Sequence, residues 1–218
     1  MLRLFTFLFI IVSFSNCKSI INRKNKVTIQ LNELKKGTLL VRLPTNHAKI
    51  ARLTEMGKLD LAKKEETINQ QFQSDIINSF TSSFDYCPVY FFYSNHAEAI
   101  KKGDIEEKIF DKERNFIHEI KTPLDQIFYA EFGQVHQNEV AMEKDGKKVK
   151  VAGFGGKDAL VIRTSEGFQP QRPFPYAVDY KSLFNGSLNL TVRKLNDRLY
   201  STHSKMERRR MRRTRRGK

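Results

Sequence analysis

Short apolar runs mark the strands that this chain is expected to form. Residues 38–43 (TLLVRL) lie between a glycine and a proline, and residues 88–93 (PVYFFY) form a run with no alternating polar positions. Runs of this length without alternation are typical of strands that are covered on both faces. Residues 126–132 and 158–163 predict two more strands, and the Asp-Gly pair within residues 143–147 predicts a hairpin between them.

Longer stretches carry the spacing of one helical face. From His47 to Phe80, apolar residues recur mainly every three or four positions, and Gly57 is expected to interrupt the helix. The apolar positions are Ile50, Leu53, Leu61, Ile68, Phe72, Ile76 and Phe80. Residues 97–102 predict a short helix, and residues 187–203 predict a closing amphipathic helix.

The order of these elements predicts the fold class. A strand, a long helix and a second strand begin the domain, and such a βαβ unit places its two strands in parallel with a right-handed crossover. The hairpin signal implies antiparallel strands as well. The sequence therefore predicts an α/β fold with a mixed, partly parallel sheet of about five strands and flanking helices, starting βαβ.

Length and charge indicate where the domain begins and ends. The 218 residues allow one domain with appendages, and 39% hydrophobic residues can supply its core. The net charge of +15 lies mostly at the ends, because residues 1–26 carry five basic and no acidic residues and residues 205–218 carry nine basic residues against Glu207. Residues 27–204, the predicted single α/β domain, are almost neutral, so the body does not have the charge of a nucleic-acid-binding surface.

Residues 205–218 are expected to be a disordered basic tail, because like charges at this density repel one another. Seven arginines of the tail are expected to contact an anionic surface: Arg208, Arg209, Arg210, Arg212, Arg213, Arg215 and Arg216. A nucleic acid would attract the same tail. A nucleic-acid binder is therefore an alternative if the protein is not exported.

The N-terminus has the pattern of an export signal. Arg3 precedes the apolar run Leu4–Phe14, which is broken only by Thr6 and Ser13. This run would rise about 16 Å as a helix, which is too short for a hydrocarbon core of ~30 Å. Residues 1–16 are therefore predicted to be a signal peptide.

The end of this signal leaves two outcomes open. Residues 14–17 (FSNC) resemble a loose bacterial lipobox, which would make Cys17 the acylated first residue of a lipoprotein. The small residues Ser13 and Ser15 also fit cleavage after Ser15, which would release a soluble protein. The predicted localisation is the cell envelope, either attached to a membrane or released, with residues 17–26 as a polar tether.

The sequence carries no established catalytic, metal or redox motif. Its two cysteines, Cys17 and Cys87, rule out a disulfide-rich scaffold and a CxxC pair. The histidines lack the HExxH spacing that places two imidazoles on one helical face. We therefore expect no cofactor and no metal, and we expect Cys87 to be a buried core residue.

A repeated motif follows the first and the second predicted strand. Thr45-Asn46-His47 and Ser94-Asn95-His96 each place a hydroxyl, an amide and an imidazole before an alanine. Such hydroxyl and amide residues are favoured helix caps, which explains the repeat without a ligand. Alternatively, parallel strands deliver both loops to one edge of the sheet, where the six residues would form a ligand edge with the two histidines beside an anion or a metal.

Three stretches carry a resemblance to a known family: residues 39–45 (LLVRLPT), 86–94 (YCPVYFFYS) and 171–178 (QRPFPYAV), behind the loose lipobox. Over most of residues 35–200, the chain resembles an uncharacterised family of exported, lipoprotein-like Bacteroidota proteins. The resemblance implies export and the fold. It implies no activity and no ligand.

These observations favour a non-enzymatic exported cell-envelope protein, a lipoprotein whose small α/β domain binds another envelope component. Its partners would be the membrane, reached through a lipid anchor and an anionic surface under the tail, and an unidentified envelope component. The alternative is an envelope hydrolase or redox enzyme of α/β form, with its site at the carboxyl edge of the sheet near Ser94, Asn95 and His96. A single cleft holding His47, His96 and a carboxylate would favour the enzyme.

Overall fold

The structure, a computed structural model, describes most of the chain between residues 25 and 216. The described ranges are 25–123, 126–136, 140–144, 147–151, 156–170, 173–180 and 187–216. The predicted signal peptide, Cys17 and most of the predicted tether lie outside the described residues.

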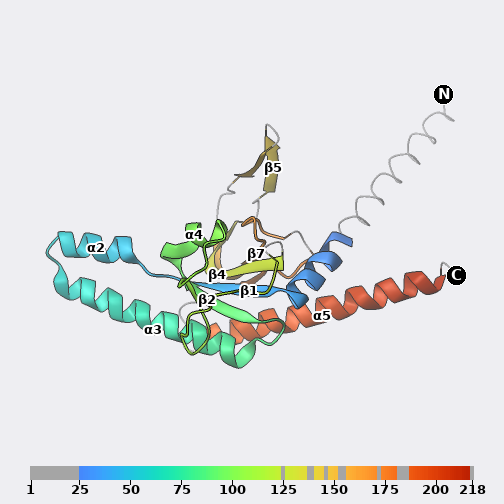
Figure 1. The fold of residues 1–218 in the computed structure, drawn as a ribbon, viewed down its shortest axis with the longest axis horizontal. Helices are drawn as coiled ribbons and strands as arrows, with labels where there is room; N and C mark the ends of the chain where they lie inside the picture. The colour runs from blue at the N-terminus through green and yellow to red at the C-terminus, as the bar shows by residue number, and fades with distance from the viewer. Residues whose placement is uncertain are drawn as a thin grey trace.

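A six-stranded mixed sheet forms the centre of the fold, with the strand order β3-β2-β1-β4-β7-β8 (Figure 1). Its strands are β1 (Thr38–Leu43), β2 (Val89–Tyr93), β3 (Ile109–Phe110), β4 (Ile127–His136), β7 (Gly156–Arg163) and β8 (Ala177–Asp179). β1 is parallel to β2 and to β4, and the other neighbours are antiparallel. The predicted α/β class and the parallel pairing of the first two strands are confirmed. β3 and β8 are strands that the sequence pattern did not predict.

The predicted hairpin is also present. β5 (Val140–Lys144) and β6 (Lys147–Val151) pair antiparallel in a separate two-stranded sheet. Lys144 lies opposite Lys147, the register expected for a two-residue turn. The turn residues themselves, Asp145 and Gly146, lie outside the described residues. The hairpin is inserted between β4 and β7, which pair directly with each other.

The long helical stretch is divided where the sequence predicted. α2 (His47–Glu55) ends just before Gly57, whose φ of 69° suits a residue without a Cβ, and α3 (Leu59–Ser83) follows. The predicted short helix is α4 (Ala97–Lys101), which is preceded by the 3-10 turn η1 (Ser94–His96).

Residues 25–36 form a helix that the sequence pattern did not predict, named the N-terminal helix below. Val27, Leu31 and Leu34 are buried, and their spacings of four and three place them on one face. The helix includes residues 25 and 26. The tether predicted for residues 17–26 therefore does not extend to its predicted end.

The structure corrects the prediction for the C-terminus. The amphipathic helix expected over residues 187–203 is present, but α5 (Ser187–Arg216) continues through most of residues 205–218, the stretch predicted as a disordered tail. Arginine is a good helix former, and extending an existing helix needs no new nucleation. Met206, inside the predicted tail, is buried against the core.

Apolar side chains cover both faces of β1. The same coverage was predicted for residues 88–93, and in β2 it holds for Phe91, in the main core cluster, and for Phe92, in the smaller one. Leu39, Val41 and Leu43 belong to the main core cluster, which also takes in residues of the N-terminal helix, α3 and α5. Leu40 belongs to a smaller cluster with Ile100 of α4. In Figure 1, α3 and α5 run side by side along one face of the sheet, and α4 lies on the other.

Tyr86 joins the N-terminal helix to α5. Its hydroxyl donates a hydrogen bond to the carbonyl oxygen of Leu31 (3.1 Å) and lies 2.9 Å from Nδ1 of His203. Nε2 of His203 in turn lies 3.0 Å from Oδ1 of Asn32. Burial raises the pKa of Tyr86, so this hydroxyl stays neutral at physiological pH. The network therefore fixes the beginning of the described chain against its last helix.

Glu131 in β4 links the three central strands through its carboxylate. Oε1 accepts a hydrogen bond from Nε of Arg163 in β7 (2.6 Å), and Oε2 accepts one from Nη1 of Arg42 in β1 (2.9 Å). Burial by itself would raise the pKa of Glu131. The two guanidinium groups outweigh burial, so the pKa lies below its ordinary value.

Replacing Phe91 tests whether β2 is central to the core. Phe91 is 1% exposed, and its ring centroid lies 6.4 Å from that of Phe80 and 6.2 Å from that of Phe110. Phe91→Ala should lower the free energy of unfolding by about 3–5 kcal/mol, measured by chemical denaturation, because the lost ring leaves a cavity. The control Phe116→Ala removes an exposed ring and should cost much less. Equal losses for the two variants would contradict the central position of β2.

Replacing Glu131 tests the charge cluster. Because its pKa is lower in the folded chain, its stabilisation is present above the ordinary glutamate pKa and is lost as the pH falls through the folded-state value. Glu131→Gln should therefore lower the free energy of unfolding by about 1.5–3 kcal/mol at neutral pH. The difference from wild type should shrink below about pH 4.3.

The matched control for this experiment is Glu113→Gln, which changes an exposed carboxylate. It should leave the pH dependence of unfolding unchanged. A loss for Glu131→Gln that is the same at every pH would contradict the role of the charge.

Candidate functional site

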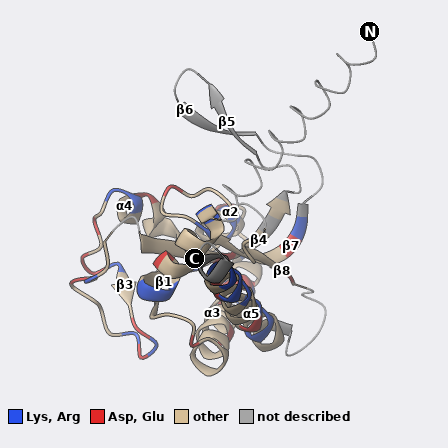
Figure 2. Cartoon of the chain, turned by 90° about the vertical axis from the view of Figure 1, so that its right-hand side faces the viewer, with Lys and Arg blue, Asp and Glu red and all other residues tan. Residues whose placement is uncertain are grey.

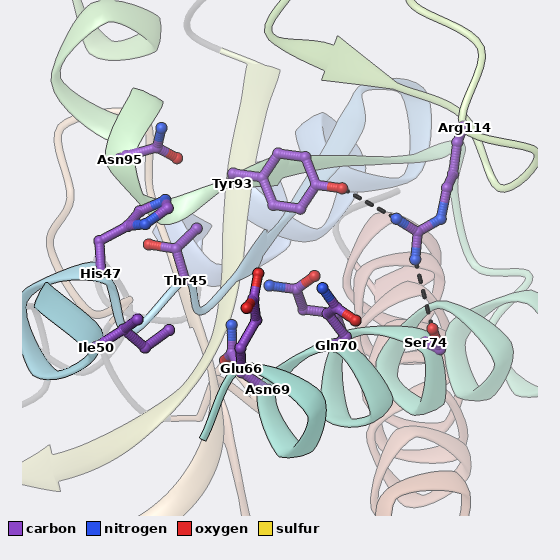
Figure 3. Close-up of a pocket in the computed structure, with 11 residues that line it drawn as sticks. Thr45, His47, Ile50, Glu66, Asn69, Gln70, Ser74, Tyr93, Asn95 and Arg114 are labelled. Carbon is purple, nitrogen blue, oxygen red and sulfur yellow. Dashed lines mark hydrogen bonds between the residues drawn. The ribbon is translucent and has the colours of Figure 1, made fainter. Parts of the chain in front are cut away.

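A cavity of about 530 Å³ opens at the carboxyl ends of β1 and β2 (Figure 3). Both loops reach this edge because the two strands are parallel, and α3 supplies the floor. The volume lies within the range of roughly 300–1,000 Å³ that is usual for small-molecule sites. The lining residues are Thr45, His47, Ile50, Glu66, Asn69, Gln70, Gln73, Ser74, Tyr93, Asn95 and Arg114.

The floor of the cavity is a polar face of α3. Glu66, Asn69, Gln70 and Gln73 are spaced i, i+3, i+4 and i+7, so they lie on the same side of the helix. Asn69 and Gln73 are only 6% and 7% exposed. Farther along α3, most of the buried positions are apolar and enter the core, as Ile76 does. The middle of α3 thus buries the amides of Asn69 and Gln73 where a packing helix would bury leucines.

The single apolar face predicted for residues 47–80 is only partly confirmed. Leu61 and Ile68, two of its predicted members, are 51% and 54% exposed. The beginning of α3 extends past the edge of the sheet together with α2 (Figure 1), so no sheet covers these side chains. Spacing identified a helix, but it did not identify which side of that helix meets the rest of the protein.

Two amides of the floor have different roles. Nε2 of Gln73 donates a 2.6 Å hydrogen bond to the carbonyl oxygen of Pro44, which holds the loop after β1 against α3. Oδ1 of Asn69 is buried and has no hydrogen-bond partner among the described residues. An unpaired buried polar atom costs about 1–3 kcal/mol, and such atoms are rare in folded proteins. A polar group kept at this cost in a cavity wall points to a ligand-related role.

The loops that follow β1 and β2 are bonded to each other. Oγ of Ser94 accepts a hydrogen bond from the backbone N–H of Thr45 (3.1 Å) and lies 2.9 Å from its Oγ1. Asn46, with a φ of 50°, donates through Nδ2 to Oε1 of Glu65 (3.1 Å). None of the three helices that begin at these loops, α2, η1 and α4, has a side-chain hydrogen bond from its N-cap residue. The hydroxyls of the repeated motif therefore join the two loops, and the predicted capping is not what they provide.

The structure brings half of the predicted ligand edge to the cavity. Thr45, His47 and Asn95 line it, whereas the other three motif residues, Asn46, Ser94 and His96, are not among the lining residues. Nε2 of His96 lies 3.4 Å from Nδ2 of its neighbour Asn95. The two histidines therefore do not face one ligand. Within the described ranges, no group of three His, Cys, Asp or Glu side chains is arranged to hold a metal ion.

Two opposite charges line the cavity. Arg114 reaches in from the loop after β3, where Nη1 donates to the hydroxyl of Tyr93 (3.0 Å) and Nη2 donates to Oγ of Ser74 (3.4 Å). Its φ of 68° is unusual for a residue with a side chain, and such backbone conformations cluster at functional sites. Glu66 stands toward the other end of the floor. Neither charge has an ion-pair partner among the described residues.

Sequence reasoning missed Arg114, Tyr93 and the polar residues of α3. One signal was present in the sequence: Asn69 and Gln73 stand at the same spacing as Ala62, Ile76 and Phe80, so they interrupt an otherwise apolar face. The position of Arg114 had no sequence signal. Its loop reaches α3 only because β3 pairs with β2.

Ser94 and Cys87 are the nucleophilic side chains that a hydrolase or a redox enzyme of this form would use, and the structure shows the surroundings of both. The hydroxyl of Ser94 is bonded to Thr45, and no imidazole is among its hydrogen-bond partners in the described residues. Cys87 is buried, as predicted, and burial raises the pKa of its thiol to about 12, so the thiol is protonated and inert at neutral pH. The described lining of the cavity consists mainly of side chains that donate or accept hydrogen bonds.

Comparison of the chain with protein-family models, with curated proteins and with solved structures gave no match. Among the described residues, no helix has both the length and the apolar character needed to cross a membrane. The chemistry of the cavity and of the surface is therefore what a functional assignment rests on.

Proposed function

We propose that this protein is a non-enzymatic, exported cell-envelope lipoprotein whose α/β domain binds a small polar ligand in the cavity. The observation that carries the binding function is the buried polar floor of α3, with the unpaired Oδ1 of Asn69. Export and acylation at Cys17 rest on the charged start, the short apolar run and the lipobox-like end of residues 1–17.

The exposed end of α5 supports a second contact with the membrane. Lys205, Arg208, Arg209 and Arg212 are spaced i, i+3, i+4 and i+7, and all four are exposed, so they form one basic stripe. Met206 is the last buried residue of α5 among the side chains described. Beyond it the helix projects from the body (Figure 1), and Figure 2 shows basic residues along α5.

The arrangement of the N-terminal helix and α5 would place the lipid anchor and the basic stripe near the same membrane. Lys35 of the N-terminal helix lies 3.1 Å from Tyr200, and Asn32 lies 3.0 Å from His203, so this helix runs antiparallel to α5. The beginning of the N-terminal helix is therefore directed toward the basic stripe. A lipid anchor at Cys17, only eight positions before residue 25, would bring the stripe close to the same bilayer. Next to anionic lipid, each basic residue would contribute about 1 kcal/mol to the free energy of membrane binding.

Metabolic labelling with a palmitate analogue tests the anchor. Wild type should be labelled and recovered with membranes, and Cys17→Ala should be unlabelled, because the acyl chains attach to this thiol. The matched control Cys87→Ala removes the buried cysteine and should keep the label. Absence of label from wild type would contradict the lipoprotein assignment, and retention of the protein inside the cell would instead favour nucleic acid as the partner of the basic stripe.

Vesicle cosedimentation tests the basic stripe. In full-length protein that carries Cys17→Ala, replacing Lys205, Arg208, Arg209 and Arg212 with glutamine should weaken binding to anionic vesicles by roughly tenfold or more. The control replaces four exposed body lysines with glutamine, Lys58, Lys63, Lys64 and Lys102, which removes the same charge. Binding should fall at high salt and be absent with neutral lipid. Equal binding by the two variants would show that the stripe does not contact the membrane.

A further inference from the structure

We propose that the cavity takes a short peptide of two or three residues with free termini, its carboxylate at Arg114 and its ammonium group at Glu66. This inference rests on the binding function proposed above and names the ligand class. It follows from two unpaired opposite charges placed at the two ends of one polar floor (Figure 3).

Arg114 has the properties of a carboxylate site. Among the described residues its guanidinium is held by neutral partners, the hydroxyls of Tyr93 and Ser74. These two hydrogen bonds orient the guanidinium without neutralising it. A guanidinium offers five N–H donors and binds a carboxylate through two parallel hydrogen bonds, so donors remain for a ligand.

Glu66 is placed to bind an ammonium group. It is exposed at the rim of the cavity and has no ion pair among the described residues, whereas its neighbour Glu65 is paired with Lys49 at 2.6 Å. Glu66 and Ser74, the residue that contacts Arg114, are eight positions apart on α3, which is about 12 Å along the helix axis. This separation keeps the two charges from pairing with each other and leaves room for a ligand between them.

The lining of the cavity also carries groups that match a peptide backbone. Asn69, Gln70 and Asn95 carry carboxamides, which both donate and accept hydrogen bonds, as a peptide group does. An extended chain spans about 3.3–3.6 Å per residue, so two or three residues with their terminal charges fit the distance. Ile50 is the one aliphatic residue in the lining, which favours small ligand side chains such as alanine.

A neutral sugar is the strongest competing ligand. Its hydroxyls would also bond to the carboxamides, but it would leave the charges of both Arg114 and Glu66 without a counterpart. A simple anion would use Arg114 and be repelled by Glu66. A ligand with one positive and one negative end satisfies both groups, and a zwitterionic peptide also supplies donors and acceptors between them.

Calorimetric titration of the mature full chain with trialanine tests the proposal. Wild type should bind free trialanine, and both the N-acetylated and the C-amidated peptide should bind roughly tenfold or more weakly, because each lacks one charge. Glu66→Gln should bind the free and the acetylated peptide equally. Arg114→Gln should bind the free and the amidated peptide equally, and Arg114→Lys should restore part of the preference for the free carboxylate.

The matched controls are Lys112→Gln and Glu113→Gln, which change charges on the same loop as Arg114 outside the cavity lining. Both should behave as wild type, and a loss of folding by Arg114→Gln would be detected by circular dichroism. If Arg114→Gln does not fold, the peptide preferences of Arg114→Lys and Glu66→Gln still test the proposal.

The results separate the peptide proposal from the binding function. If blocking the termini has the same effect in every variant, or if a neutral disaccharide binds and trialanine does not, the peptide is overturned and the cavity remains a binding site. If neither probe binds wild type, the peptide is overturned and the binding function proposed for the cavity loses its support.

Discussion

β1 pairs in parallel with β2 on one side and with β4 on the other, so that Val41 lies opposite both Phe91 and Ala130. This pairing buries β1 on both faces and brings the loops after β1 and β2 to one edge of the sheet. There the hydroxyls of Thr45 and Ser94 meet at 2.9 Å, a contact between residues 49 positions apart in the sequence. The mouth of the cavity depends on this register, because a shift of β2 by one residue would turn its side chains to the opposite face.

α3 serves two purposes along its length. Ile76 and Phe80 pack in the main core and hold the helix against the sheet. One or two turns earlier, Asn69 and Gln73 occupy equivalent positions and form the floor of the cavity. Apolar side chains there would stabilise the fold, since they would bury area without an unpaired polar atom. The part of α3 that forms the cavity floor therefore stabilises the fold less than an apolar surface would, and the part that packs on the sheet supplies the apolar contacts.

Hydrogen bonds and aromatic contacts hold the two ends of the described chain together, and the ammonium group of Lys35 takes part by donating to the hydroxyl of Tyr200. Tyr86 contacts Leu31 on the N-terminal helix and His203 on α5, and its T-shaped contact with Tyr200 adds apolar packing. Arg208, Arg209 and Arg212, which follow Met206 on α5, are exposed. Their charge is then available to an anionic partner, and their helical conformation holds them at fixed spacing.

The sequence by itself determined the types of most elements, the break at Gly57, the parallel βαβ beginning and the hairpin, because each follows from the spacing of neighbouring residues. It also indicated the sheet edge that carries Thr45, His47 and Asn95, since parallel strands end together. The tertiary structure decided which helical face is buried, that Met206 in the predicted tail packs against the core, and that Arg114 lies across the cavity from Glu66. Those features depend on contacts between residues distant in the chain, and local periodicity contains no information about such contacts.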